Sequence, residues 1–147
     1  MLAGPSPSEH QVGEVLKRFE LRVVVAESHE LLRHGLVEVL TTAGAQVSQA
    51  VDSESALRMV AVGRADVLLV SLDLPGSERG HVVAIARDRW PALAIVAMSP
   101  EPDQDAMLRA LELGASAYLP KTASPDRLVA TTTQAASAPG AFLAEDV

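Results

Sequence analysis

The sequence predicts an α/β protein whose five parallel strands form a doubly wound, three-layer sheet in the order 2-1-3-4-5. Short runs of branched apolar residues alternate with longer segments whose apolar residues recur at helical spacing. This alternation repeats in strict order along the chain, and right-handed crossovers then require neighbouring strands to be parallel. Polar residues follow several of the strands, at the sheet edge where ligands gather in such folds.

The stretch from Ala65 to Gly80 organises the rest of the chain. Val67–Val70 is an unbroken apolar run, typical of a central strand that is buried on both faces. Ser71 ends the run, and a Pro-Gly pair predicts a turn before the next helix. Ser71 and Asp73 are therefore expected at the carboxyl edge of the sheet, where any active site should be centred.

The other strands are expected at residues 22–27, 46–51, 93–98 and 116–119. The strand at 46–51 alternates partly with polar residues, which favours a position near an edge of the sheet. The strands at 22–27, 93–98 and 116–119 end at Glu27-Ser28, at Ser99 and shortly before Lys121.

Helical spacing and stop signals predict the intervening helices. Ser53 is expected to cap a helix that ends at Gly63, a third helix must end before Pro91, and a fourth is expected at 103–113. A helix over 29–42 is indicated by apolar residues that share one face, namely Leu32, Leu36, Val39 and Leu40.

The last helix is expected to open at Ser124 with Pro125 in its first turn. Its β-branched run at 131–133 is a poor helix former, so we expect this helix to fray. Residues 21–137 then make up the domain, and residues 138–147 are interpreted as a tail or the start of a linker to an absent output domain.

Residues 1–20 are interpreted as an N-terminal extension. Residues 1–8 are rich in Gly, Pro and Ser, which predicts disorder. From Ser8 onward two interpretations stand side by side, a short amphipathic helix packed on the domain or on a partner, and a loosely docked lead-in. The apolar face of that helix would consist of Val12, Val15, Leu16 and Phe19.

Composition excludes several classes of function. Hydrophobic residues make up 48% of the 147 residues and aromatic residues only 3%, so Val, Leu and Ala must build the core. The net charge of −7 and the absence of a Lys/Arg cluster argue against a grip on nucleic-acid phosphates. Without cysteine there are no disulfides and no thiolate-bound metal. No secretory signal or membrane-length apolar stretch is found, so a cytoplasmic location is expected.

Each polar residue at the strand ends has an ordinary structural explanation when taken alone. Ser28 can cap a helix, Ser99 can satisfy a backbone donor, and a lone lysine in a loop is usually solvated. Their joint occurrence after four strands points instead to a shared site, made of Glu27, Ser28, Ser71, Asp73, Ser99 and Lys121.

At these positions the sequence resembles the receiver domain of two-component response regulators, over roughly residues 21–137. The resemblance is carried by the segments Val23–Leu36, Asp66–Gly76 and Leu111–Lys121, and it is nearest to the NarL/FixJ branch, whose receivers precede a helix-turn-helix domain. It implies the flavodoxin-like, CheY-like version of the predicted sheet.

The resemblance also implies roles from which this chain departs. The family's acidic pair is matched by Glu27 and Ser28, and its phosphate-accepting aspartate is matched by Ser71. Phosphotransfer needs an ionised carboxylate nucleophile and a carboxylate-bound Mg²⁺. Only Glu27 and the backbone carbonyl of Asp73 remain as matching ligands, so Mg²⁺ binding is expected to be weak or absent, and no other cofactor or metal is expected.

The retained residues of the family pattern need another partner. Lys121 matches the family's lysine, and without an acceptor carboxylate its natural ion-pair partner is Glu27. Ser99 and Tyr118 match the two residues that move when a receiver is phosphorylated. In this chain packing should set their positions.

These observations favour an atypical receiver that acts without phosphorylation, as a regulatory and homodimerising module of a transcription factor. DNA would be contacted only through an absent output domain, and a small molecule or a partner protein could take over the switching. A stand-alone adaptor that binds a partner protein through its last two helices is the alternative if Val147 is the natural terminus.

Two further classes of function are disfavoured. An enzyme with Ser71 as nucleophile lacks a Gly-x-Ser-x-Gly elbow and a histidine base, because the candidate histidines lie on predicted helices. A flavodoxin-like cofactor binder would need glycines in the first strand–helix turn, which here runs from Ala26 to His29 and contains none.

Overall fold

The computed structural model describes residues 21–76 and 78–143. The predicted short helix in the N-terminal extension lies outside the described residues. In chain order the elements are β1 (Arg22–Ala26), α2 (Glu30–Thr42), β2 (Gln46–Ala50), α3 (Ser53–Gly63), β3 (Val67–Ser71), η1 (Glu78–Gly80), α4 (His81–Arg89), β4 (Ala94–Ser99), α5 (Gln104–Leu113), β5 (Ala117–Pro120) and α6 (Pro125–Ser137).

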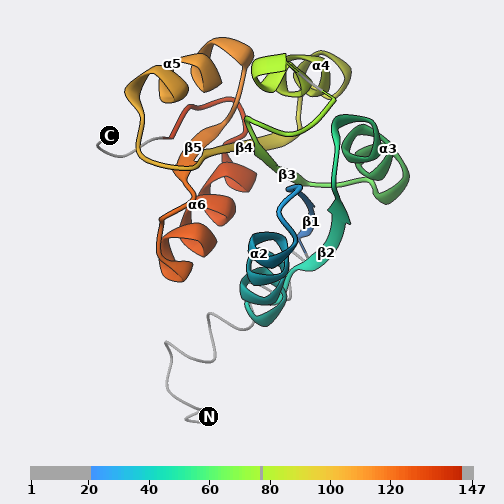
Figure 1. Cartoon of the computed structure of the whole chain (residues 1–147). Helices are drawn as coiled ribbons and strands as arrows, with labels where there is room; N and C mark the ends of the chain where they lie inside the picture. The colour runs from blue at the N-terminus through green and yellow to red at the C-terminus, as the bar shows by residue number, and fades with distance from the viewer. Residues whose placement is uncertain (1–20, 77, 144–147) are drawn as a thin grey trace, which may run out of the picture.

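The strands form one parallel sheet in the order β2-β1-β3-β4-β5, which confirms the predicted topology (Figure 1). Helices α3, α4 and α5 cover one face of this sheet, and α2 and α6 cover the other. Each layer packs through small and branched side chains, such as Ala86 and Ala110 on one face and Leu40 and Leu128 on the other. The fold is the three-layer flavodoxin-like arrangement.

Burial along the strands follows their places in the sheet. Every residue of β3 and β4 is buried, as the apolar runs predicted for strands covered on both faces. Strand β2 at one edge keeps most of its residues partly or fully exposed, which confirms the interpretation of its mixed pattern.

The start of α3 differs from the prediction. Asp52, and not Ser53, is the N-cap: its carboxylate accepts the backbone N–H of Ser55 at 2.8 Å, and the Ser55 hydroxyl completes a capping box. Ser53 lies in the first turn, where its backbone N–H and its hydroxyl both donate to the carbonyl of Pro75. Asp52 and Ser53 both have good capping side chains, so the sequence leaves the N-cap ambiguous. In the structure Ser53 binds the loop after β3, and Asp52 caps the helix.

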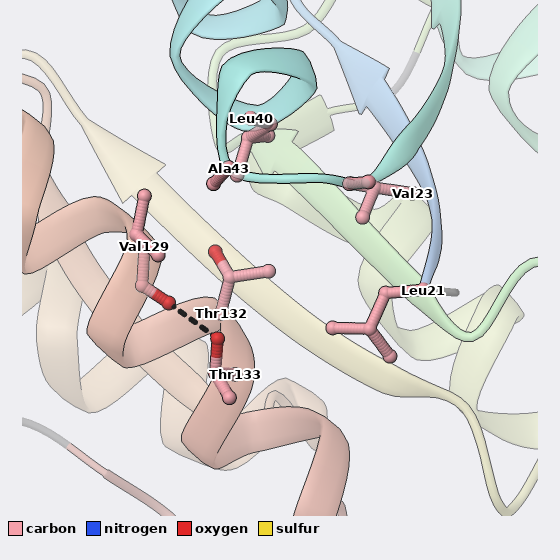
Figure 2. A pocket seen from close by; sticks show the side chains of 8 residues that line it. Leu21, Val23, Leu40, Ala43, Val129, Thr132 and Thr133 are labelled. Atoms are coloured by element: carbon pink, nitrogen blue, oxygen red, sulfur yellow. Dashed lines mark hydrogen bonds between the residues drawn. The ribbon is translucent and has the colours of Figure 1, made fainter. Parts of the chain in front are cut away.

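Helix α6 runs through the threonine run to Ser137, so the predicted fraying is wrong. Ser124 caps the helix ahead of Pro125, as predicted. The Thr133 hydroxyl donates to the carbonyl of Val129 at 2.8 Å, and the Thr132 side chain is buried against the sheet (Figure 2). Packing therefore outweighs the low helix propensity of these residues.

A small pocket lies between α6, the end of α2 and the start of β1 (Figure 2). It offers about 10 Å³, room for a single water molecule at most. Its lining is mainly aliphatic, and the residues involved are Leu21, Val23, Leu40, Ala43, Ala45, Val129, Thr132 and Thr133. This pocket is a packing defect between helices and not a ligand site.

The C-terminal residues correct another expectation. Residues 138–143, interpreted from the sequence as tail or linker, return along the open side of β5, and Leu143 forms a parallel bridge with Ala117. In Figure 1 this segment passes beside β5 after α6. We call Ala138–Leu143 the β5 strap.

One arginine joins α4 to the amino end of β5. The half-buried guanidinium of Arg87 donates to the carbonyls of Gly114, Trp90, Pro91 and Leu93 and to the hydroxyl of Ser116. Burial lowers the pKa of Arg87, yet a guanidinium stays charged at any pH at which the domain folds. Four loop carbonyls thus depend on one side chain.

Among the described residues, no helix is long and apolar enough to span a bilayer.

We expect Arg87→Lys to lower the free energy of unfolding by about 1–3 kcal/mol, because a lysine cannot reproduce the planar fork and leaves partly buried carbonyls without donors. Urea denaturation followed by circular dichroism measures this loss. Arg89→Lys, two residues further on and exposed, is the matched control and should change stability by less than about 0.5 kcal/mol. Equal effects of the two substitutions would contradict the assignment.

Candidate functional site

The carboxyl edge of the sheet brings the predicted polar residues together from four strands. Glu27 follows β1, Ser71 ends β3, Ser99 ends β4 and Lys121 follows β5. Because the strands are parallel and in register, these positions lie along one rim. Glu27 and Ser71 are both 0% exposed, so solvent does not reach these two side chains.

The Lys121 ammonium forms an ion pair with Glu27, with Nζ 2.7 Å from Oε1. Only 8% of the Lys121 side chain and none of the Glu27 side chain is exposed. This pair confirms the prediction made from the missing acceptor carboxylate. A buried ammonium needs a hydrogen-bonded or charged partner, and Glu27 supplies it from across the sheet.

Asp73 is the second carboxylate that contacts Lys121, with Oδ1 3.2 Å from Nζ. The Ser71 hydroxyl donates a short hydrogen bond to the same carboxylate oxygen. The Asp73 side chain is 51% exposed, in contrast to the buried Glu27. Lys121 therefore bridges one inner and one outer carboxylate, and Ser71 is tied to the outer one.

The second oxygen of Glu27 is held by His29. The backbone N–H of His29 donates to Oε2 at 2.9 Å, and the ring Nδ1 lies 2.8 Å from the same oxygen. The sequence predicts His29 only as the first residue of the helix over 29–42, with no contact to Glu27. In the structure it is the N-cap residue of α2, and its backbone N–H and ring both point back to the strand end.

Arg33 also contacts the end of β1, and the sequence did not predict this contact. Its Nη1 donates to the backbone carbonyl of Glu27 at 3.0 Å, and its Nε donates to Gln49. Ser28 is half-buried, and no contact of its hydroxyl with the cluster is found in the part of the chain that the structure describes. Arg33 lies in the first turn of α2, directly after this strand end, and no motif in the sequence marks its contact with the Glu27 carbonyl.

Both carboxylates have lowered pKa values, although desolvation acts in the opposite direction on each of them. Desolvation raises the pKa of Glu27, but the hydrogen bonds from Lys121 and His29 and the charge of Lys121 outweigh it. Desolvation also raises the pKa of Asp73, and it is outweighed by the Ser71 hydroxyl and by Lys121. Both groups are therefore ionised at neutral pH, and the one ammonium faces two carboxylates, so these three groups together carry one net negative charge.

This donor set does not fit an octahedral Mg²⁺ site. Both oxygens of Glu27 already face nitrogen donors, and Oδ1 of Asp73 faces Ser71 and Lys121. The described residues contain no group of three or more His, Cys, Asp and Glu side chains arranged to hold a metal. Mg²⁺ prefers six oxygen ligands, usually with carboxylates that no ammonium occupies.

Ser99 and Tyr118 form a second polar pair next to the first. Their hydroxyls share a short hydrogen bond, and both also contact the backbone carbonyl of Glu101. Tyr118 is 1% exposed, so its ring is turned into the protein. The backbone N–H of Lys121 donates to the Ser99 carbonyl at 2.7 Å, which joins the two pairs into one cluster.

The comparisons with known proteins agree with this geometry. The family model of the response regulator receiver domain matches residues 23–133. The chain belongs to the response regulator receiver domain family. This finding confirms the resemblance recognised from the sequence.

Among relatives, the chain is 28% identical over 113 residues to the uncharacterized transcriptional regulatory protein YhcZ of Bacillus subtilis, covering 76% of this chain and 53% of that protein. It is 29% identical over 112 residues to the probable transcriptional regulatory protein NarL of Mycobacterium tuberculosis, covering 75% and 52%. The chain thus spans about half the length of the curated relatives it matches.

Solved structures give the same result. The signal receiver domain of the putative response regulator NarL from Mycobacterium tuberculosis matches with a TM-score of 0.74 and 27% identity, over 81% of this chain and 98% of that one. A LuxR-family two-component response regulator from Aurantimonas sp. matches with a TM-score of 0.75 and 23% identity, over 83% and 88%. The second match supports the fold alone.

We expect Lys121→Met to destabilise the domain by about 3–5 kcal/mol near neutral pH, because it leaves the Glu27 charge buried without its partner. Glu27 has a lowered pKa in the folded chain, so its contribution is present above the ordinary glutamate pKa and is lost as the pH falls. The stability difference between wild type and variant should therefore shrink from about pH 7.5 to about pH 4. Urea denaturation at both pH values tests this.

The double variant Glu27→Gln/Lys121→Met is the matched control. It removes both charges, so it should recover much of the lost stability and should lose the pH dependence that Glu27 causes. A loss from Lys121→Met that is equal at both pH values would show that packing, and not the ion pair, is the source of the effect.

Proposed function

We propose that this chain is an atypical receiver domain that regulates without phosphorylation of β3. The observation that carries this proposal is Ser71: it stands at the end of β3, is fully buried, and donates its hydroxyl to Asp73. The group that would accept phosphate by resemblance is thus a neutral alcohol in an enclosed position, beside a lysine already neutralised by Glu27.

Several features argue against chemistry at Ser71. A serine hydroxyl is un-ionised at neutral pH and needs a general base. Asp73 accepts its hydrogen bond, but a carboxylate whose pKa is lowered is a weak base for this purpose. The side chain is also closed to an incoming substrate. We therefore assign the domain a regulatory role and no catalytic one, with weak or no Mg²⁺ binding.

The relatives support a role in transcription regulation. Those at 28–29% identity bear names of transcriptional regulatory proteins, and this chain covers about half of them. We propose a helix-turn-helix output domain beyond residue 147, which would make the DNA contacts that a domain of net charge −7 cannot make well. By the same analogy we propose a homodimer in the cytoplasm.

A stand-alone adaptor is the second candidate, and one surface favours it. Leu108 and Leu111 project from α5 with 46% and 47% of their surface exposed, three residues apart on the same side. Such a pair suits an apolar contact with another protein, whether a second copy or a different partner. A long natural reading frame with basic residues downstream would favour the transcription factor instead.

The test is an amide NMR titration of the chain with Mg²⁺ and then with beryllofluoride, a mimic of the bound phosphoryl group. For the wild type, resonances of Glu27, Ser71, Ser99 and Lys121 should not shift in a saturable way. The variant Ser28→Asp/Ser71→Asp restores both carboxylates and should gain saturable shifts at millimolar Mg²⁺.

Ser71→Ala serves as the control for this pair of experiments, since it removes the hydroxyl without supplying a carboxylate. It should behave like the wild type. Saturable shifts in the wild-type chain would refute the proposed phosphorylation-independent role, because Asp73 or Glu27 would then have rescued the site.

A further inference from the structure

The β5 strap is attached to β5 by backbone hydrogen bonds of the kind that join strands. The N–H of Leu143 donates to the carbonyl of Ser116 at 2.8 Å, and the N–H of Tyr118 donates to the carbonyl of Leu143 at 3.0 Å. Phe142 packs against the core on the side of α5, and Leu143 packs against the core on the side of α6. Successive residues thus point to opposite faces, as in a strand.

A side chain anchors the other end of the strap. The Ser116 hydroxyl donates to the carbonyl of Pro139 at 2.7 Å, and it also accepts from Ile95 N–H and from Arg87. Ser116 is 0% exposed, so its hydroxyl is fixed by the core. The strap therefore docks on a prepared position and is not merely lying on the surface.

The strap nevertheless has few contacts to lose. One bridge and one side-chain hydrogen bond attach it to β5, Ala141 is exposed, and Phe142 and Leu143 are only half-buried. Segments with few buried contacts open at much lower free energy than the core of a domain. The strap is thus joined to the sheet by one bridge, whereas each pair of neighbouring strands is joined over four or five register pairs.

Tyr118 connects the strap to the site. Its backbone N–H is bonded to Leu143, and its hydroxyl is bonded to Ser99 and Glu101 at the carboxyl edge. Ser99 in turn accepts the backbone N–H of Lys121 through its carbonyl. One residue of β5 therefore carries contacts to both the end of the described chain and the polar cluster.

We propose that the strap, docked on the edge of β5, holds Tyr118 in its inward position and so couples this edge to the polar cluster. Release of the strap removes the hydrogen bond to the Tyr118 backbone and lets its ring move. The hydrogen bond between Tyr118 and Ser99 is then weakened, and with it the contact of Ser99 with Lys121. Because coupling between two sites is reciprocal, a change at the polar cluster also changes how tightly the strap is held. A role of this coupling in signalling rests on the proposed function. The contact between the strap and β5 does not depend on that function.

The experiment uses the full chain with fluorinated tyrosine. Tyr118 is the only tyrosine, so 3-fluorotyrosine gives a single fluorine resonance that reports on its ring. Leu143→Pro removes the N–H that donates to Ser116 and should release the strap. Gly140→Ala is the control, since an added methyl group at Gly140 meets no atom within 4 Å.

In Leu143→Pro the amide of Tyr118 should exchange with solvent at least about tenfold faster than in the wild type. The amide of Leu72, bonded to Met98 in the sheet, should keep its rate as the internal reference. The fluorine resonance should shift or split. Gly140→Ala should match the wild type in all three readouts.

Two results would overturn the proposal. A Tyr118 amide that stays as protected in Leu143→Pro as in the wild type would show that the strap does not hold β5. A fast amide with an unchanged ring resonance would show that docking and ring position are not coupled. Should Leu143→Pro speed up the Leu72 amide as well, Phe142→Ser, which keeps the backbone donors, replaces it with the same expectations. A failed beryllofluoride titration refutes the proposed function separately and leaves these readouts unaffected.

Discussion

A buried ammonium group sets the chemistry of the carboxyl edge of this sheet. Lys121 is largely withdrawn from water and faces Glu27 from within and Asp73 from outside. With a third carboxylate at position 71, one ammonium would face three negative charges, which is the situation that a divalent cation relieves. Ser71 removes that third charge. The remaining ammonium and two carboxylates carry one net negative charge, and their contacts join the ends of β1, β3 and β5 to one another.

The same edge is reinforced by neutral hydrogen bonds. Ser99 and Tyr118 bind each other and the Glu101 carbonyl, and the backbone of Lys121 is attached to Ser99. At the opposite end of β5, Ser116 is held by Arg87 and holds the strap. Strand β5 is short, yet side-chain hydrogen bonds hold it in place at both ends.

Much of the fold was predictable because strand order follows from strict alternation and from handedness. The Glu27–Lys121 pair was predictable because a lysine buried at a sheet edge needs a negative partner. Other features depend on geometry that residue types do not encode. Asp52 and Ser53 are both good caps, so the choice between them was decided by the Pro75 carbonyl. His29 turns back to Glu27 through a cap conformation, and a single strand bridge after Pro139-Gly140 leaves no periodic signal.

An open sheet ends in two strands whose unpaired backbone groups can template the addition of further strands. In this domain the β5 side is occupied by the strap, and β2 on the far side carries Gln46, Ser48 and Gln49 in a largely exposed strand. The interior strands are built almost wholly of Val, Leu, Ile and Ala, a composition prone to cross-strand association when exposed. The strap covers backbone groups on the outer side of β5, and a chain whose strap is released would present these groups as an open β-edge to its neighbours in a crowded solution.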